Sequence, residues 1–196
     1  MENFDQLLKE EQKKYLKAYS SESYIYTSPG LVKIWDALPW LNRKPIISIL
    51  DVGCGEGYVV KVLHKSGYLA YGTDIVDVVR KEIIHNHNFF QIPIWDLRKI
   101  GNFDAVVSFD MLEHLPEHIV DLSLENLTTI STFFYFTISC RPDQAGRSIG
   151  EDLHLTVKPP SWWIEKLMSN GFKIDGFSGN VNELKIFGAT SNKKRR

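Results

Sequence analysis

The stretch ILDVGCGEGYVV, residues 49–60, joins an apolar run to three glycines placed within five positions. The apolar part predicts a buried strand, and the residues after the last glycine predict a helix. Glycine costs backbone entropy, so three of them at one strand-to-helix junction indicate a functional demand. Because glycines permit positive φ and let a ligand approach backbone N–H groups, Gly53, Gly55 and Gly57 predict a ligand-binding loop.

Apolar runs alternate with helical stretches from Pro45 onward. This alternation predicts an α/β, Rossmann-like fold, with a doubly wound and mostly parallel sheet covered by helices on both faces. The last two strands lack an intervening helix, so we expect them to pair antiparallel at one edge. The expected strands are 46–51, 68–74, 89–92, 103–109, 132–139, 172–177 and 183–189. The expected helices of this part are 57–66, 75–84, 117–130 and 161–170.

The first 44 residues precede the alternating pattern and are expected to form an N-terminal helical cap. Apolar side chains recur at helical spacing between Phe4 and Tyr19, and Ser28-Pro29 is typical of the start of a second helix. We therefore divide the chain into a cap (1–44), a main domain (45–190) and a basic tail (191–196).

The composition is that of an ordinary globular protein with almost no net charge. The 196 residues include 23 Lys and Arg against 24 Asp and Glu, which makes a uniformly basic nucleic-acid binder a poor interpretation. Two cysteines make no disulfide framework, and we find neither a signal-peptide core nor a run of about 18 apolar residues. We expect a cytoplasmic protein with no membrane span, and the sequence leaves its oligomeric state undetermined.

A carboxylate stands at the end of the second expected strand. Asp74 lies 21 residues after Gly53, in YGTDIVD. Ligands of open parallel sheets bind beyond the carboxyl ends of the strands, so Asp74 is placed to accept hydrogen bonds from both ribose hydroxyls of an adenosine. A helix N-cap is an alternative role that is compatible with the first. The spacing G-x-G-x-G, with Glu56 inside it, disfavours a pyrophosphate and suits a cofactor with an amino-acid end and a positive charge.

Four stretches of the chain resemble the class I S-adenosylmethionine-dependent methyltransferases. They are LDVGCGEG (50–57), GTDI (72–75), FDAVVSFDMLEHLPE (103–117) and HLTVKPPSWWIEKLMSNGF (154–172). The resemblance covers residues 46–190. It implies S-adenosyl-L-methionine as the cofactor, and a methyltransferase fold with a seven-stranded sheet whose last strand runs antiparallel.

The resemblance also implies which residues hold the cofactor. Gly53, Cys54 and Gly55 would line its methionine part, and Asp74 would bind its ribose. The further positions that we assign to the cofactor site are Asp51, Gly57, Ile75, Phe109 and Asp110.

The adenine pocket departs from the family pattern. Many relatives carry an acid after the third strand that contacts the adenine amino group, whereas this chain aligns Pro93 there. Either Asp96 substitutes for that acid, or Trp95 and Leu97 sandwich the adenine ring.

Methyl transfer from a sulfonium chiefly requires that the protein align the acceptor and remove its proton. Asp110, Glu113 and His114 follow the fourth expected strand, at a spacing that places them on one face of a helical turn. His154, in the loop before the last helix, is expected to close the same pocket. Our catalytic candidates are His114, His154 and Glu113; the alternative is that Glu113 and His114 only brace the following helix.

The same two carboxylates and two imidazoles form a donor set that suits a divalent cation. They resemble the metal-ligand sets of small-RNA 2′-O-methyltransferases and of ubiquinone-pathway O-methyltransferases. A cation would lower the pKa of an acceptor hydroxyl. Many metal-free relatives carry a similar Glu-His pair, so we do not favour a cation, and the metal content stays open.

The acceptor pocket is expected to use the aromatic cap and the late loop. Arg141 would meet an anionic acceptor, with a solvated loop arginine as the alternative. We expect methyl transfer to oxygen or nitrogen of a small molecule such as a sugar, glycan precursor or secondary metabolite. The alternatives are a metal-assisted RNA 2′-O-methyltransferase and a catalytically silent cofactor-binding module. The acceptor-pocket candidates are Tyr19, Tyr24, Tyr26, Arg141, Trp162 and Trp163.

Overall fold

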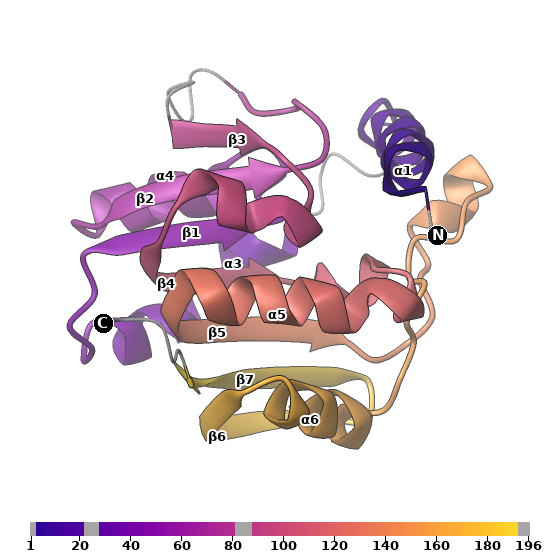
Figure 1. Ribbon diagram of the computed structural model, residues 1–196. Coiled ribbons are helices and arrows are strands. Elements are labelled where there is room, and N and C mark those ends of the chain that lie inside the picture. Colours follow the sequence, from indigo (N-terminus) through magenta and orange to yellow (C-terminus); the bar gives the residue numbers. More distant parts are fainter. Residues whose placement is uncertain (1–2, 22–27, 81–87, 192–196) are drawn as a thin grey trace.

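The apolar runs become the strands of a seven-stranded sheet in a computed structural model of the protein (Figure 1). The structure describes residues 3–21, 28–80 and 88–191. The strand order is β3-β2-β1-β4-β5-β7-β6. Only β7 runs against its neighbours, which confirms the predicted sheet. The strands are β1 (Ser48–Val52), β2 (Leu69–Asp74), β3 (Phe89–Gln91), β4 (Phe103–Phe109), β5 (Ser131–Ser139), β6 (Phe172–Asn180) and β7 (Glu183–Thr190).

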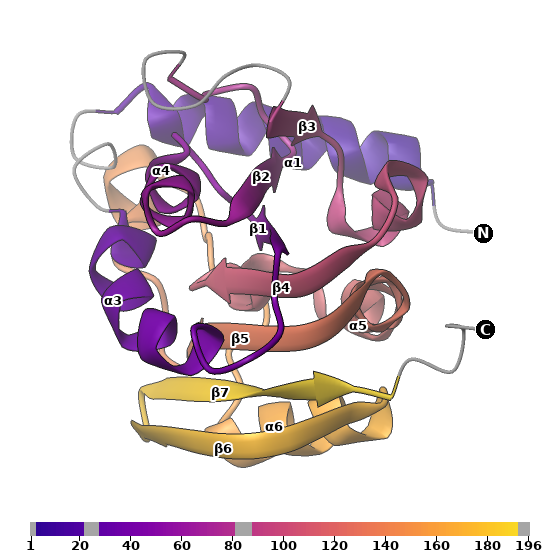
Figure 2. The same ribbon diagram turned by 90° about the vertical axis from the view of Figure 1, so that its left-hand side faces the viewer.

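Helices cover both faces of this sheet, because parallel neighbours are joined by crossover connections. Figures 1 and 2 show α3 and α4 on one face and α5 and α6 on the other. Within the described segments, no helix combines the length and the apolar character needed to cross a bilayer. The α-helices are α1 (Phe4–Tyr19), α3 (Pro29–Leu41), α4 (Tyr58–Lys65), α5 (Val120–Ile130) and α6 (Pro160–Ser169). The 3₁₀ helices are η2 (Ile94–Ile100), η3 (Leu112–His114), η4 (Glu117–Ile119) and η5 (Gly146–Ile149).

The core consists of one apolar layer on each face of the sheet. In β4, Val106 points into the layer under α5 and α6, whereas Ala105 and Val107 point into the layer under α3 and α4. All three side chains are fully buried, as expected for a central parallel strand. These two layers fix the strand ends, from which the functional residues project.

One predicted helix is wrong in its described part. Residues 75–80 form no helix, and the rest of the expected range 75–84 lies outside the described residues. The reason is competition for backbone groups: the Ile75 carbonyl accepts hydrogen bonds from the side-chain amides of Gln12 (2.8 Å) and Gln91 (3.1 Å). The other expected elements are observed within a few residues of their predicted ends.

The two helices of the expected cap occupy different places. Helix α1 lies beyond the carboxyl ends of the strands (Figure 1), whereas α3 packs on the sheet and buries Ile34 and Leu41 completely. Helix α3 is thus part of the core. The boundaries after residues 44 and 190 stay predictions, and residues 192–196 of the basic tail lie outside the described part.

Candidate active site

A cavity of about 590 Å³ lies at the carboxyl ends of the strands, against α1. This is the edge at which ligands of open parallel sheets bind, and the volume suits a small-molecule site. Its wall brings together most of the positions that the sequence predicts for cofactor and catalysis. The predicted residues on this wall are Asp51, Gly53, Cys54, Gly55, Asp74, Ile75, Trp95, Phe109, Asp110, His114 and His154.

The glycine loop forms the floor at one end of the cavity. The amides of Gly53 (2.8 Å) and Cys54 (3.0 Å) both donate to the Thr73 carbonyl, which fastens the loop to the end of β2. Gly55 has φ +51°, and a Cβ atom there would lie 2.6 Å from the hydroxyl oxygen of Tyr19 on α1. A side chain at this position would therefore strain the backbone and displace α1.

Asp74 connects the tip of β2 to the same loop. Its carboxylate accepts the N–H of Gly55 at 3.0 Å and the N–H of Val76 at 3.2 Å. Burial raises the pKa of Asp74, and these N–H donors oppose that shift. No helix follows in residues 75–80, so the alternative role of a helix N-cap is not observed. The carboxylate instead lies on the cavity wall, one hydrogen bond from the glycine loop.

Asp51 brings a second carboxyl group to this end of the cavity. The side chain is buried, and no described residue forms a hydrogen bond with its Oδ2 atom. Burial, and secondarily the nearby Asp74, raise the pKa of Asp51 well above its usual range. A cationic donor from a ligand would satisfy this oxygen and favour its charged form. The ammonium group of S-adenosylmethionine fits that requirement.

The far side of the cofactor end is apolar. Trp95 lies on the wall, with the ring of Phe4 from α1 5.8 Å away, centroid to centroid. An adenine ring fits such a surface, because flat aromatic rings stack on apolar and aromatic side chains. Three isoleucines share this region of the wall: Ile75, Ile92 and Ile94.

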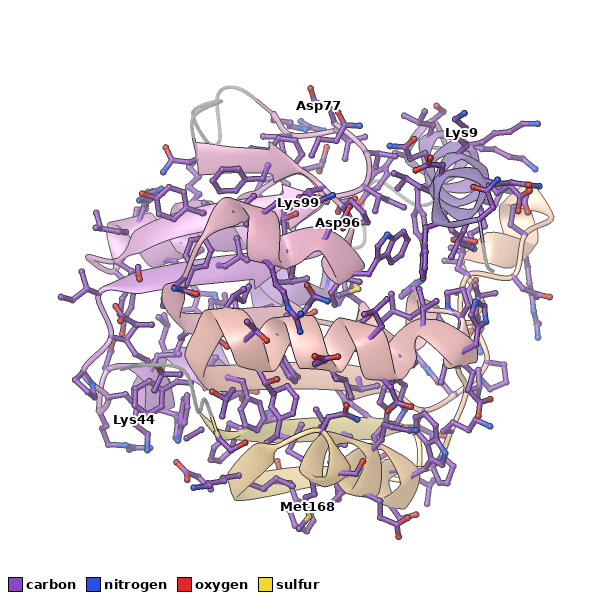
Figure 3. All side chains as sticks on the ribbon, viewed as in Figure 1. Lys9, Lys44, Asp77, Asp96, Lys99 and Met168 are labelled. Atoms are coloured by element: carbon purple, nitrogen blue, oxygen red, sulfur yellow. The ribbon has the colours of Figure 1, made fainter. Side chains whose placement is uncertain are left out.

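The other two residues considered for adenine do not reach the wall. Leu97 is completely buried in the layer under α5, and Asp96 forms an ion pair with Lys99 at 2.7 Å (Figure 3). Both follow from the 3₁₀ turns of η2, which direct Leu97 to the sheet and Asp96 outward. We therefore withdraw Asp96 and Leu97 as adenine-binding residues and keep Trp95.

A cluster of one tyrosine and two histidines lies at the other end of the cavity. The hydroxyl of Tyr15, on α1, is 2.6 Å from Nδ1 of His114. The rings of His114 and His154 are 4.8 Å apart and nearly perpendicular. Nδ1 of His154 lies 2.7 Å from the carbonyl oxygen of Arg141. Because a carbonyl only accepts, this nitrogen of His154 carries a proton, and Nε2 of the neutral ring is the proton acceptor.

Comparison with known families agrees with this geometry. Residues 27–148, more than half of the chain, match the family described as "Methyltransferase domain". The chain belongs to this methyltransferase family. At the level of the family and the fold, this confirms the predicted class I S-adenosylmethionine-dependent methyltransferase.

The curated relatives match a limited part of this methyltransferase. The ubiquinone biosynthesis O-methyltransferase of Acinetobacter baumannii (strain AYE) is 29% identical over 79 residues. That match covers 35% of this chain and 33% of the relative. The matched stretch thus spans about a third of the relative's length.

Two solved structures share the fold over nearly the whole chain. One is the 1,6-didemethyltoxoflavin-N1-methyltransferase of Burkholderia thailandensis, with bound 1,6-didemethyltoxoflavin and S-adenosylhomocysteine. The match has a TM-score of 0.77 and 14% sequence identity, and it covers 98% of this chain and 92% of that chain. The other is the magnesium protoporphyrin IX methyltransferase of Synechocystis PCC 6803, with bound S-adenosylhomocysteine: TM-score 0.65, 18% identity, 95% and 97%. At these identities the likeness concerns the fold alone.

Glu113 of the methyltransferase does not reach the cavity and is a positioning residue. Its side chain is fully buried, and Oε1 accepts the N–H of Ser139 at 2.9 Å. Its backbone carbonyl accepts the N–H groups of Leu155 and Thr156, each at 2.9 Å. Burial raises the pKa of Glu113 well above its usual range. We therefore withdraw Glu113 as a catalytic residue, because it instead anchors the segment that carries His154.

Three further candidates also lie off the wall. Gly57 caps the N-terminus of α4 with φ +90°, so it sets the direction of that helix. Trp163 is buried in the core, and Trp162 packs against its ring at 4.9 Å between centroids. Tyr24 and Tyr26 lie outside the described residues, whereas Tyr19 and Arg141 are on the wall.

The structure adds two residues of α1 that sequence reasoning missed. Glu11 and Tyr15 line the wall together with Tyr19. These positions follow one another at intervals of four, so they share one face of the helix. The spacing was visible in the sequence, but which face would meet the cavity was not.

Burial and the nearby His154 lower the pKa of His114 to about 3. We therefore expect the ring of His114 to stay neutral between about pH 8 and about pH 5, where an ordinary histidine titrates. The ring-nitrogen and ring-carbon chemical shifts, assigned with a His114→Gln variant, measure this directly. A midpoint near the ordinary value of about 6.5 would contradict the prediction.

Only part of the predicted set of metal ligands comes together in the structure. Donor atoms of Glu113, His114 and His154 lie within 4.8 Å of one another. Asp110 is not in this group, because its carboxylate accepts hydrogen bonds from Lys33 (2.6 and 2.8 Å) and from Thr137 (2.7 Å). The remaining group has one carboxyl group and two imidazoles, a smaller donor set than the two carboxylates and two imidazoles expected from the sequence.

We expect Mg²⁺ to leave the thermal unfolding midpoint of the protein unchanged relative to the same protein in chelator. A ligand that binds only the folded state raises the midpoint, so differential scanning calorimetry reports binding without any need for an acceptor. A midpoint that rises with Mg²⁺ in the wild type, and not in His154→Ala, would establish a metal site here.

Lys33 is another residue that the sequence analysis did not single out. It lies 77 positions from Asp110, whose two carboxylate oxygens both accept from its ammonium, and it also pairs with Glu183. Asp110 has φ +51°, a costly conformation for a residue other than glycine. Lys33 and Thr137 thus hold a strained strand tip on the cavity wall and join it to α3.

Replacing Lys33 by Met should lower the free energy of unfolding by about 1–3 kcal/mol, because it leaves a largely buried carboxylate without its charged partner. Lys99→Met is the matched control. It removes an exposed pair (Figure 3) and should change the stability by less than about 0.5 kcal/mol. Urea denaturation of the two variants measures the difference, and equal losses would contradict the proposed role of Lys33.

Proposed function

We propose that this chain transfers the methyl group of S-adenosylmethionine to an oxygen of a small-molecule acceptor. One observation carries the proposal: a single cavity joins a set of residues suited to this cofactor to a cluster of hydrogen-bonding rings. Membership of the methyltransferase family and the shared fold support it.

In this proposal the cofactor end works by matching charge and shape. Asp74 accepts the ribose hydroxyls, and Asp51 with the glycine loop receives the amino-acid end. Trp95 lies against the adenine. When bound, the cofactor supplies a methyl group already activated by its sulfonium.

In this proposal the cluster of Tyr15, His114 and His154 binds and activates the acceptor. His154 accepts the proton of an acceptor hydroxyl at Nε2, while the Arg141 carbonyl fixes its ring and tautomer. His114 stays neutral, and its hydrogen bond with Tyr15 brings the phenol of α1 to the reacting oxygen. Oxygen is favoured as the methylated atom by the name of the curated relative, an O-methyltransferase.

A small acceptor fits this site better than RNA. Helix α1 contributes to the wall through Glu11, Tyr15 and Tyr19, so it partly covers the cavity. The net charge of −1 offers no general attraction for a polyanion. A large acceptor would have to displace α1 from these contacts.

The test is to incubate the protein with methyl-labelled S-adenosylmethionine and, in parallel, with a small-molecule extract and with total RNA. We expect label in O-methyl products of the extract, no label in RNA, and much weaker labelling with Asp74→Asn. Binding of S-adenosylhomocysteine without any label transfer would instead identify a silent cofactor-binding module. Label in RNA alone would overturn the small-molecule assignment.

A further inference from the structure

Most charged groups on the cavity wall are paired or hydrogen-bonded within the described residues; the exceptions are Oδ2 of Asp51 at the cofactor end and the guanidinium of Arg141 at the acceptor end. Glu11 pairs with Lys14 at 2.5 Å, and Glu56 pairs with Arg80 at 2.5 Å. Asp110 is held by Lys33, as described above. Arg141 is the only lysine or arginine that the described part of the chain contributes to this wall.

Among the described residues, none accepts a hydrogen bond from the guanidinium of Arg141, and none forms an ion pair with it. The nearest acid in sequence, Asp143, is engaged elsewhere: its carboxylate accepts the N–H groups of Ala145 at 2.9 Å and Gly146 at 2.6 Å. Asp143 is thus held by its own turn, and no ion pair joins it to Arg141 among the described residues.

Arg141 also stands beside the proposed base. Its backbone carbonyl accepts the Nδ1 proton of His154 at 2.7 Å, so one residue of the wall both orients the base and carries a guanidinium. An anion held by this guanidinium would lie within one side-chain length of His154. The planar guanidinium of an arginine can donate two parallel hydrogen bonds to the two oxygens of a carboxylate or phosphate. A neutral group in place of the anion would lose the charge part of this interaction.

We propose that the acceptor is an organic oxyanion, and that Arg141 selects it by pairing with its carboxylate or phosphate group while the reacting oxygen faces His154. This inference rests on the proposed function, because it assigns the acceptor to the same cavity. It makes Arg141 a specificity-determining residue, so its loss weakens acceptor binding and leaves cofactor binding intact.

The test uses the protein saturated with S-adenosylhomocysteine and three probes of similar shape: benzoate, phenyl phosphate and the neutral benzamide. We expect benzoate or phenyl phosphate, but not benzamide, to shift the side-chain Nε–H resonance of Arg141 in a saturable way. The preferred anion distinguishes a carboxylate acceptor from a phosphate acceptor.

Variants assign the effect to the guanidinium. Arg141→Gln should weaken binding of the anionic probe by about 10- to 100-fold, the range expected for one hydrogen-bonded charge. Arg141→Lys should retain part of the affinity, because it keeps the charge and loses the fork. Arg43→Gln is the matched control: it removes an exposed arginine before β1, at the opposite end of the sheet, and should have no effect.

The same samples separate this inference from the proposed function. If the wild type does not bind S-adenosylhomocysteine, the proposed function fails. If it binds S-adenosylhomocysteine but takes benzoate and benzamide equally, or takes no probe at all, only the oxyanion assignment is overturned.

Discussion

Replacing Asp74 by Asn lowers the affinity of the protein for S-adenosylhomocysteine by about 100-fold, equivalent to about 2.7 kcal/mol. The carboxylate accepts the N–H groups of Gly55 and Val76 and, in the proposal, both ribose hydroxyls. An amide has a single acceptor oxygen, so it loses charge-assisted hydrogen bonds worth about 1.5–3 kcal/mol each. It also turns an NH₂ group towards one of these backbone N–H donors.

Isothermal titration calorimetry with S-adenosylhomocysteine measures the loss, and circular dichroism confirms that the variant is folded. Asp77→Asn is the matched control, three residues further on. Asp77 is exposed, and Figure 3 shows it at the upper margin of the molecule. Wild-type affinity in Asp74→Asn would contradict the cofactor assignment. Among the described residues, Asp74 is the one at the tip of β2 whose side chain forms a hydrogen bond with the glycine loop.

Replacing His154 by Ala lowers kcat by about 10²- to 10⁴-fold, the usual contribution of a general base. The affinity for S-adenosylhomocysteine stays unchanged, because the cofactor end of the cavity does not involve this ring. Added imidazole should restore part of the activity of His154→Ala, since it can occupy the vacated space and accept the proton. Turnover of the acceptor found in the extract screen measures the loss of kcat and the rescue by imidazole, and isothermal titration calorimetry measures the affinity for S-adenosylhomocysteine.

His64→Ala is the control for this prediction, because His64 is exposed on α4 and away from the cavity wall. Tyr15→Phe should lower kcat by about 10-fold, as it removes the hydrogen bond to His114 and keeps the ring. If His154→Ala turns over at the wild-type rate, the base is a different group. If its activity is low and imidazole has no effect, His154 acts by supporting the loop rather than by moving a proton.

The sheet and one end of the site were predictable because their signals are local. The run Ile49–Val52 and the glycines after it specify a buried strand followed by a turn, whatever the rest of the chain does. Asp74 could be placed beside Gly55 because parallel strands end at one edge of the sheet. Nothing beyond element order was needed for that step.

The other end depends on contacts between distant segments. Tyr15 meets His114 across 99 residues, and Lys33 meets Asp110 across 77. The order of elements does not say where α1 comes to rest or which of its faces turns inward.

The sequence pattern also did not predict which side chains of one turn point into the cavity and which point into the core. His114 reaches the cavity, whereas its neighbour Glu113 is buried behind it, and Trp95 is separated from Leu97 in the same way. Such choices are made by packing, which is decided only when the whole core assembles.

The placement of β7 has a consequence for the order in which the sheet is completed. Strand β7 follows β6 in the chain but lies between β5 and β6. Until β7 is in place, β6 has no strand to join, and the edge of β5, which carries Phe133, Phe134 and Phe136, has no strand beside it. Strand β6 can therefore join the sheet only together with β7 or after it, so the two last strands complete the sheet as one hairpin.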